Sequence, residues 1–299
     1  MTQVWPVADL EYGRLLGLAF RMLGTVADAE DAVQEAFVRW SRLDDGARAT
    51  VRNPVGWFAR TTSRVCLDIL KSASRRHEQY VGPWLPEPVP DSRYHVPAPT
   101  DVGDPADRAA RAESVSMALV TVMESMTPAE RVAFVLRDVF DYPVAEIADV
   151  LDRSPGAVRQ LASSARSRVA SLGPDEPAGE PGARLAAAFE RAANTGDVAA
   201  LVQLLHPGVT LRSDGGGIAR AALNPVHGPD KVARFVVGVL ARQRPATLTS
   251  RSTDAGTVLT FDRDGSVSGV LELVVRDGAV IDVLIQWNPR KLRLWHAVT

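Results

Sequence analysis

Prolines divide this chain of 299 residues into separate parts. The stretch from Tyr80 to about Arg108 holds seven prolines and no sustained apolar period, so it is expected to be an extended tether and not a helix. A second break, rich in glycine and proline, follows at 173–182. The sequence therefore predicts three folded domains, at 1–80, 113–172 and 183–299, joined by linkers at 81–112 and 173–182.

Composition excludes several classes of protein. The formal net charge of −2 argues against a chain that coats nucleic acid without specificity, although it leaves room for a small basic surface. The single cysteine, Cys66, excludes an internal disulfide framework, and the five histidines show no metal-ligand spacing, so we expect neither a metal nor another cofactor. The amino end lacks a signal-peptide pattern and no apolar run approaches about eighteen residues, which predicts a cytoplasmic protein with no membrane partner.

The first domain is organised around the segment Asp28–Trp40. Its apolar residues recur at spacings of three and four, which predicts a helix with one buried face and one acidic, polar face. The polar face holds Asp28, Glu30, Asp31, Gln34 and Glu35. Thr25, three residues before Asp28, resembles part of a capping box, so some of this acidity has a purely local explanation. An apolar-periodic helix at 10–23, ended by Gly24, is expected before it.

A long helix is predicted from Pro54 to about Arg76, with Asn53 as its N-cap. One side is expected to face the core and carries Phe58, Thr62, Val65, Cys66, Ile69 and Ala73. The opposite side carries Trp57, Arg60, Arg64, Lys71 and Arg75. Such a face suits contact with a DNA strand, because cations bind phosphates and a ring can stack on an unpaired base. A solvated face with one exposed tryptophan is the alternative.

The second domain has the pattern of a helix-turn-helix. Helices are expected at 114–126 and, after a capping box of Thr127 and Glu130, to about Phe140. A further pair at 143–151 and 154–170 is joined by Asp152-Arg153, with Ser154 as N-cap of the second helix. The outward face of that helix carries Arg159, Gln160, Ser163, Arg166 and Arg168. Arginine and glutamine suit base edges in a major groove, although a generic antiparallel helix pair is an alternative.

The third domain is predicted to be α+β. Helices are expected at 184–194, 198–205 and 229–242, a strand at 209–213, and alternating strands from Thr247 onward. The dipeptide Asp277-Gly278 predicts a two-residue hairpin between strands at 270–276 and 279–287. Helices that precede an antiparallel sheet are expected to cover one of its faces.

The acidic segment DAEDAVQEAF resembles the polymerase-binding helix of bacterial sigma-70-type factors, specifically the extracytoplasmic-function class. The segment EIADVLDRSPGAVRQLASSAR resembles sigma region four, although Asp152 stands where that family usually has glycine. The resemblance implies that four side chains dock on the clamp helices of the largest polymerase subunit: Asp28, Asp31, Gln34 and Glu35. It also implies contacts with promoter DNA, at the −10 element from the long helix and at the −35 element from region four, through Trp57, Arg60, Arg64, Lys71, Arg75, Ser154, Arg159, Gln160, Ser163 and Arg166.

Within the first linker, Trp84-Leu85-Pro86-Glu87-Pro88 resembles a linker motif of a sigma subgroup that carries a third, SnoaL-like domain of the cone-shaped NTF2 superfamily. Two further motifs of that subgroup are matched imperfectly, by Asp214, Gly215, Gly216 and Gly217 and by Asn288, Pro289, Lys291 and Leu292. Ile218 stands in place of a basic residue, and Arg290 in place of an acidic one. We expect these segments to meet the linker and to regulate the sigma domains. Packing of Trp84 on the nearest domain is the simpler alternative.

These features predict an alternative sigma factor, not an enzyme, that recruits core RNA polymerase to promoter DNA. The SnoaL-like resemblance implies a hollow domain that can hold a small-molecule ligand. The sequence leaves open whether an anti-sigma partner exists, and which promoter and inducing signal are used. Two other functions remain: a SnoaL-type cyclase or isomerase that uses Asp214 and His227 and is fused to a DNA-binding module, and a polymerase-independent DNA-binding repressor.

Overall fold

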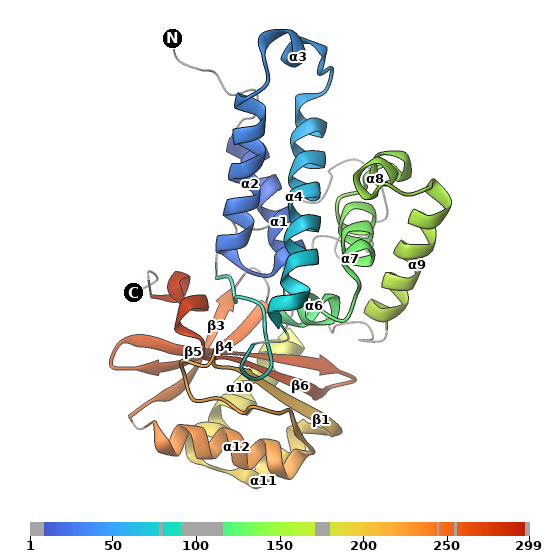
Figure 1. Cartoon of the computed structure of the whole chain (residues 1–299). Helices are drawn as coiled ribbons and strands as arrows, with labels where there is room; N and C mark the ends of the chain where they lie inside the picture. The colour runs from blue at the N-terminus through green and yellow to red at the C-terminus, as the bar shows by residue number, and fades with distance from the viewer. Residues whose placement is uncertain are drawn as a thin grey trace. The chain divides into compact units, whose positions relative to one another are not determined.

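The computed structural model describes residues 9–77, 80–90, 116–170, 180–243, 245–253 and 256–296. These residues form two compact units, drawn in Figure 1. The first unit takes in residues 9–76 and 122–170, and the second takes in residues 77, 80–90, 116–121 and 180–296. The proline-rich segment 80–90 and the short segment 116–121 therefore belong to the same unit as the C-terminal domain.

The N-terminal part of the first unit consists of α1 (Asp9–Leu23), α2 (Val26–Ser41), α3 (Asp45–Thr50) and α4 (Pro54–His77). Gly24, with φ of 76°, ends α1, and Asn53 Oδ1 accepts from Gly56 N at 3.0 Å to begin α4, so both predicted helix ends are confirmed. The short helix α3, between α2 and α4, was not predicted from the sequence. Asp44 Oδ1 accepts from Ala47 N at 2.7 Å, and this cap supports the short helix α3.

The remaining helices of this region are α6 (Met117–Met123), α7 (Pro128–Phe134), the π-helix η2 (Val135–Val139), α8 (Val144–Leu151) and α9 (Pro155–Ala170). The capping box of Thr127 and Glu130 is confirmed, with both of its hydrogen bonds present. The helix predicted to run to about Phe140 is present in two parts, because the hydrogen-bond pattern of α7 widens to a π-helix from Val135 to Val139. Asp152 adopts φ 52° and ψ 55°, which confirms that aspartate supports the left-handed turn.

The second unit contains α10 (Glu180–Thr195), α11 (Val198–Leu204), β1 (Leu205–Asp214), β2 (Val226–His227), α12 (Pro229–Arg242), β3 (Thr247–Thr253), β4 (Gly256–Arg263), β5 (Ser266–Arg276) and β6 (Ala279–Gln286). Two 3₁₀ turns follow, η3 (Pro289–Lys291) and η4 (Arg293–Trp295). The sheet order is β2-β1-β6-β5-β4-β3, in which only the β1–β6 pair is parallel. The predicted fold class, two all-α domains and a C-terminal α+β domain, is confirmed.

Two tight turns set the register of the last strands. Asp277 and Gly278 have φ of 50° and 72°, as the predicted two-residue hairpin requires. Asp264 and Gly265 have φ of 51° and 77° and form a second turn of the same kind, which the sequence analysis missed. For that reason β5 begins at Ser266 and not at residue 270 as predicted.

The sheet has an apolar core on each face. Helices α10, α11 and α12 cover the inner face, where a buried cluster includes Phe189, Val236, Phe261 and Ile285 (Figure 1). The outer face carries a second cluster, which consists of Leu85, Met117, Ala118, Val258, Val267, Val270, Val274, Leu284, Leu292 and Trp295. The linker, the start of α6 and the C-terminal tail therefore share one apolar surface. Among the described helices, none is long and apolar enough to cross a membrane.

Candidate functional site

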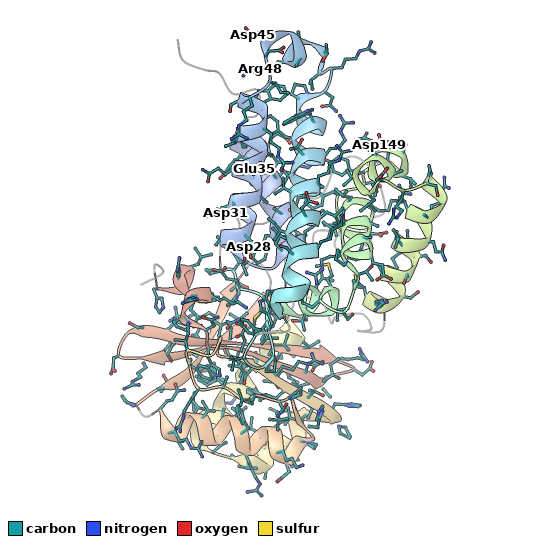
Figure 2. All side chains as sticks on the ribbon, in the orientation of Figure 1. Asp28, Asp31, Glu35, Asp45, Arg48 and Asp149 are labelled. Atoms are coloured by element: carbon teal, nitrogen blue, oxygen red, sulfur yellow. The ribbon has the colours of Figure 1, made fainter. Side chains whose placement is uncertain are left out.

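The polar face of α2 lies on the surface of the first unit, and Figure 2 shows its carboxylates along one side of the helix. Its predicted contact residues divide into the exposed Asp31 and Gln34 and the half-buried Asp28 and Glu35. Thr25 Oγ1 donates to Asp28 Oδ2 at 2.6 Å, and Glu35 Oε1 accepts from Arg39 Nε at 2.8 Å. The local capping explanation therefore accounts for Asp28, whereas Asp31 and Gln34 face solvent.

The basic side of α4 is less open than its sequence pattern indicates. Trp57 is half-buried, with its ring centroid 5.0 Å from that of Trp40 and 5.3 Å from that of Phe58. Consecutive helical residues are separated by only 100°, so the Trp57 ring reaches the apolar side that Phe58 occupies. Arg60 Nε donates to Gly56 O at 3.3 Å within the same helix. The alternative of one exposed tryptophan does not describe Trp57, which is half-buried.

The other predicted DNA contacts of α4 differ in exposure. Arg64 and Lys71 are exposed, and Arg64 Nη2 donates to Asp149 O of α8 at 2.8 Å. The side chain of Arg75 lies outside the described residues. A cleft of about 660 Å³ lies between α4 and the helix-turn-helix. It is lined by Trp57, Arg60, Thr61, Arg64, Ala148, Asp149, Asp152, Arg153 and Ser154. Part of the basic face of α4 therefore meets the turn of the second domain.

The outward-facing residues of the recognition helix α9 are of two kinds: some make no bond to another helix that the structure describes, and one is bonded to η2. Arg159, Gln160 and Ser163 are exposed near its beginning, after Ser154 Oγ has accepted from Ala157 N at 3.2 Å to cap the helix. Arg166 is exposed as well, but its Nε donates to Asp138 Oδ1 of η2 at 2.7 Å. The π-helix, which sequence analysis did not foresee, supplies the carboxylate that fixes Arg166.

The capping carboxylate of α7 also binds α9. Glu130 Oε1 accepts from Ser164 Oγ at 2.6 Å and from Arg168 Nη2 at 3.4 Å, while its Oε2 accepts from Thr127. Burial opposes ionisation of Glu130, but the hydrogen bonds from Ser164 and Thr127 outweigh it and hold the pKa of this carboxyl below its usual value. The carboxylate therefore stays charged and joins the two helices.

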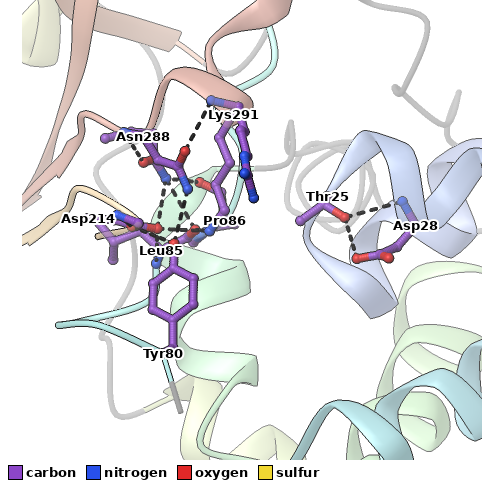
Figure 3. Close-up of polar contacts among 11 residues, drawn as sticks. Thr25, Asp28, Tyr80, Leu85, Pro86, Asp214, Asn288 and Lys291 are labelled. Atoms are coloured by element: carbon purple, nitrogen blue, oxygen red, sulfur yellow. Dashed lines mark hydrogen bonds and ion pairs between the residues drawn. The ribbon is translucent and has the colours of Figure 1, made fainter. Parts of the chain in front are cut away.

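In the second unit, three sequence motifs meet around one buried carboxylate (Figure 3). Asp214 has 0% exposure, and its Oδ2 accepts from Lys291 Nζ at 2.8 Å and from Leu85 N at 3.0 Å. Its Oδ1 accepts from Tyr80 Oη at 2.7 Å and from Gly216 N at 2.9 Å. A buried carboxylate with this many donors is well solvated by the protein.

Lys291 completes the same arrangement from the C-terminal tail. Its Nζ donates to Leu85 O at 2.5 Å and lies 4.1 Å from the ring centroid of Trp84 and 5.3 Å from that of Tyr80. Gln286 Nε2 donates to Leu85 O and Pro86 O at 3.2 and 3.1 Å. Residues of the three motifs are therefore in contact, whereas their regulatory role stays a prediction.

Further bonds fix the ends of the linker motif. Asn288 Nδ2 donates to Tyr80 Oη at 3.1 Å, and Trp295 Nε1 donates to Pro88 O at 2.8 Å. Burial, with the hydrogen bond to Asp214 as the second cause, raises the pKa of the Tyr80 phenol. Leu85, Pro86, Glu87 and Pro88 are buried, whereas Trp84 is half-buried. Tyr80 and Gln286 were not predicted from the sequence. The one feature of the sequence that could have indicated them is that each lies close to a matched motif.

Close contacts and backbone angles explain why glycines occupy positions 215–217. Gly216 has φ of 60°, and a Cβ there would lie 2.2 Å from Asn288 Nδ2. A Cβ on Gly215 would lie 2.2 Å from Ala219 O, and Gly217 has φ of 70°. The two departures from the subgroup pattern, Ile218 and Arg290, are both exposed, so the buried contacts are made by the matched residues.

The pair considered for catalysis does not have the geometry of an acid and base. Asp214 is sealed in the linker contacts, whereas His227 is exposed on β2, with its Nδ1 3.2 Å from Thr210 Oγ1. Asp214 and His227 therefore make separate contacts and do not form an acid–base pair.

Comparison with known proteins defines the class. The family Sigma-70 region 2 matches residues 9–76, and the family Sigma-70, region 4 matches residues 116–169. These ranges contain the acidic helix α2, the basic helix α4 and the helix-turn-helix. The two helical domains are therefore those of a sigma-70-type transcription factor.

Relatives along most of the chain narrow this class. The chain is 43% identical over 237 residues to the ECF RNA polymerase sigma factor SigJ of Mycobacterium tuberculosis strain H37Rv, covering 77% of this chain and 71% of the relative. It is 36% identical over 283 residues to the probable ECF RNA polymerase sigma factor SigI of the CDC 1551 strain, covering 91% and 89%. The crystal structure of the M. tuberculosis SigJ superposes with a TM-score of 0.71 at 34% identity, covering 95% of this chain and 96% of that one. The chain belongs to the ECF sigma factors of RNA polymerase, and it is a transcription factor and not an enzyme.

Proposed function

We propose that this sigma factor docks on core RNA polymerase through the exposed polar face of α2. The single observation that supports this most directly is the exposure of Asp31 and Gln34 in the domain that matches sigma region two. Glu35 lies on the same face, one turn after Asp31, where its pair with Arg39 can exchange for a basic partner. Asp28 contributes both to the cap and to the acidity of this face.

Promoter contacts are assigned to α4 and α9. Arg159, Gln160 and Ser163 are exposed near the beginning of α9 and suit direct reading of the −35 element. Arg64 and Lys71 suit the phosphates near the −10 element, and Trp57 and Arg60 suit the melted strand. Ser154 and Arg166 set the start and the orientation of α9, since one caps it and the other is held by Asp138.

The free protein is expected to bind promoter DNA weakly. Several residues assigned to DNA line the cleft between α4 and the helix-turn-helix, and Arg64 is bonded there to Asp149. The two DNA-reading domains must also be held about two helical turns apart, which polymerase provides. Core polymerase is therefore the partner that makes both surfaces available at once.

The second unit regulates in cis the transcription activity of the two sigma domains. Its contacts with Tyr80, Leu85 and Pro86 hold the segment that follows the first sigma domain, and they use residues of the two motifs around Asp214 and Lys291. Fixing this segment limits where polymerase can place the two sigma domains. Holding of the linker by the C-terminal domain is the proposed means of regulation.

Charge reversal on α2 tests the polymerase assignment. Asp31→Lys combined with Glu35→Lys should abolish binding to purified core polymerase and run-off transcription, while the stability of the fold changes by only about 0.5 kcal/mol. The matched control is Asp45→Lys with Asp68→Lys, which reverses two exposed carboxylates of the same domain away from α2 and should leave core binding intact. Undiminished core binding by the folded α2 variant would contradict the proposal and favour a polymerase-independent repressor.

A further inference from the structure

The start of α6 is bonded to the C-terminal domain. Glu272 of β5 directs both carboxylate oxygens at its first turn: Oε2 accepts from Met117 N at 2.9 Å and Oε1 from Ala118 N at 3.0 Å. Ser116 Oγ accepts from Leu119 N at 3.2 Å. The family match for sigma region four begins at residue 116, so these are the first residues of the second sigma domain.

This carboxylate pairs backbone N–H groups at the start of α6 that have no acceptor within the helix. The first backbone N–H groups of a helix have no partner within the helix, and negative charge near them is favourable. The first turn of α6 contains no acidic residue, and the helix has only seven residues, too few for independent stability. The local cap, Ser116, accepts from Leu119 N, and Glu272 supplies from the C-terminal domain the acceptors for Met117 N and Ala118 N together with a negative charge.

Apolar burial acts together with the carboxylate. Met117 and Ala118 are 2% and 4% exposed and belong to the outer-face cluster of the sheet. Leu85 of the linker motif belongs to the same cluster. The linker near its beginning, at Leu85, and the second sigma domain at its beginning, at Met117 and Ala118, are thus both anchored on one sheet face.

We propose that Glu272 is a positioning residue through which the C-terminal domain restrains the second sigma domain, by holding the first turn of α6 on the outer face of the sheet. This proposal rests on the proposed function of the second unit as a regulator in cis. While α6 is docked, the second sigma domain remains tied to the C-terminal domain. When Glu272 releases it, the connection lengthens and polymerase can place the domain freely.

Removing the carboxylate should change the docking equilibrium measurably. Glu272→Ala removes two charge-assisted hydrogen bonds, so the ratio of docked to released α6 is expected to fall about tenfold, which corresponds to about 1.4 kcal/mol. Glu272→Gln keeps one acceptor oxygen without the charge and should fall between wild type and alanine. Hydrogen exchange of the peptide covering residues 116–121 should accelerate in the same order.

A distance measurement on the full-length chain tests the restraint itself. Spin labels at Ser167→Cys on α9 and Lys231→Cys on α12 occupy exposed sites, and the native Cys66 is buried. Electron–electron double resonance should give a broader distance distribution after Glu272→Ala than for the parent chain. The matched control is Glu190→Ala, which removes a carboxylate bonded to Ser250 N at 2.9 Å inside the C-terminal domain, and should leave the distribution as it is in the parent chain.

Two results would overturn the proposal. One is an unchanged distribution and unchanged exchange at 116–121 in the Glu272→Ala chain. The other is equal broadening by Glu190→Ala, which would indicate general loosening of the domain. Both measurements are made without polymerase or DNA, so their failure is distinguishable from failure of core binding by the α2 face.

Discussion

Among single residues, Asp214 and Lys291 form a buried ion pair that contacts the linker. Both side chains are removed from water, with exposures of 0% and 8%, and their charged atoms lie 2.8 Å apart. Desolvation of such a pair is costly, and it is offset here by further donors to Asp214 and by the Trp84 ring beside Lys291. Loss of one partner leaves a buried charge without compensation.

Lys291→Met is therefore expected to destabilise the second unit by about 3 to 5 kcal/mol. Urea unfolding of the full chain measures this change, and Lys231→Met, at an exposed site on α12, is the control expected to stay within about 0.5 kcal/mol. Combining Lys291→Met with Asp214→Asn should recover part of the loss, because the uncompensated charge is then removed as well. An Lys291→Met chain as stable as the parent would contradict this account.

The lowered pKa of Glu130 predicts that the stability of the first unit depends on pH. Its pKa in the folded chain is lowered, against about 4.3 when unfolded, so the native state binds fewer protons in that range. The stability it contributes is present above the unfolded pKa and is lost as the pH falls through the folded pKa. Glu130→Gln keeps the capping-box pattern but not the charge, so its unfolding free energy should decrease less as the pH falls from about 5 to well below 4. Equally steep decreases for both chains in urea unfolding would contradict the prediction.

At the scale of elements, helix ends were predicted well because their causes are local. Gly24, Asn53, Thr127, Asp152 and Ser154 each act within a few residues of their own position. The π-helix at Val135–Val139 and the short helix α3 were missed. A residue pattern with helical period does not distinguish a π turn from an α turn, and α3 has no buried residue to give it an apolar period.

The two kinds of arginine on α9 lead to different expectations. Arg159→Ala should cost about 1 to 3 kcal/mol of discrimination at one or two positions of the −35 element, because this exposed side chain can read a base edge. Arg166→Ala should instead weaken all promoters to a similar degree, since Arg166 is tied to Asp138 and orients the helix. A promoter-library selection with polymerase holoenzyme measures both effects. A change of preference confined to the −10 region in Arg159→Ala would contradict the assignment of this domain.

At the scale of the whole molecule, the sequence indicated that three motifs belong together but not how they bond. Leu85 and Asp214 are 129 residues apart and Leu85 and Lys291 are 206 apart, so no periodicity or turn signal connects them. The resemblance of the motifs to a sigma subgroup carried that information. Tyr80, Gln286 and Glu272 lie outside the motifs, and their roles became visible only when the backbone placed them.

The contacts of Trp84 and the tail should behave as one interface. Trp84→Ala removes the ring beside Lys291, and deletion of the chain from Asn288 removes Lys291 itself, so both should change run-off transcription in the same direction. Because the deletion also removes Leu292 and Trp295 from the outer-face cluster, Lys291→Ala provides a milder second variant.

If one interface is involved, Trp84→Ala and Lys291→Ala together should change transcription less than the sum of their separate effects, with a coupling of about 0.5 to 3 kcal/mol. Trp84→Ala combined with Lys231→Ala, at the exposed site on α12, is the control pair and should be additive. Additive effects of the first pair would mean that Trp84 acts through a different contact, and the regulatory role of the linker motif would then have to be separated from the tail.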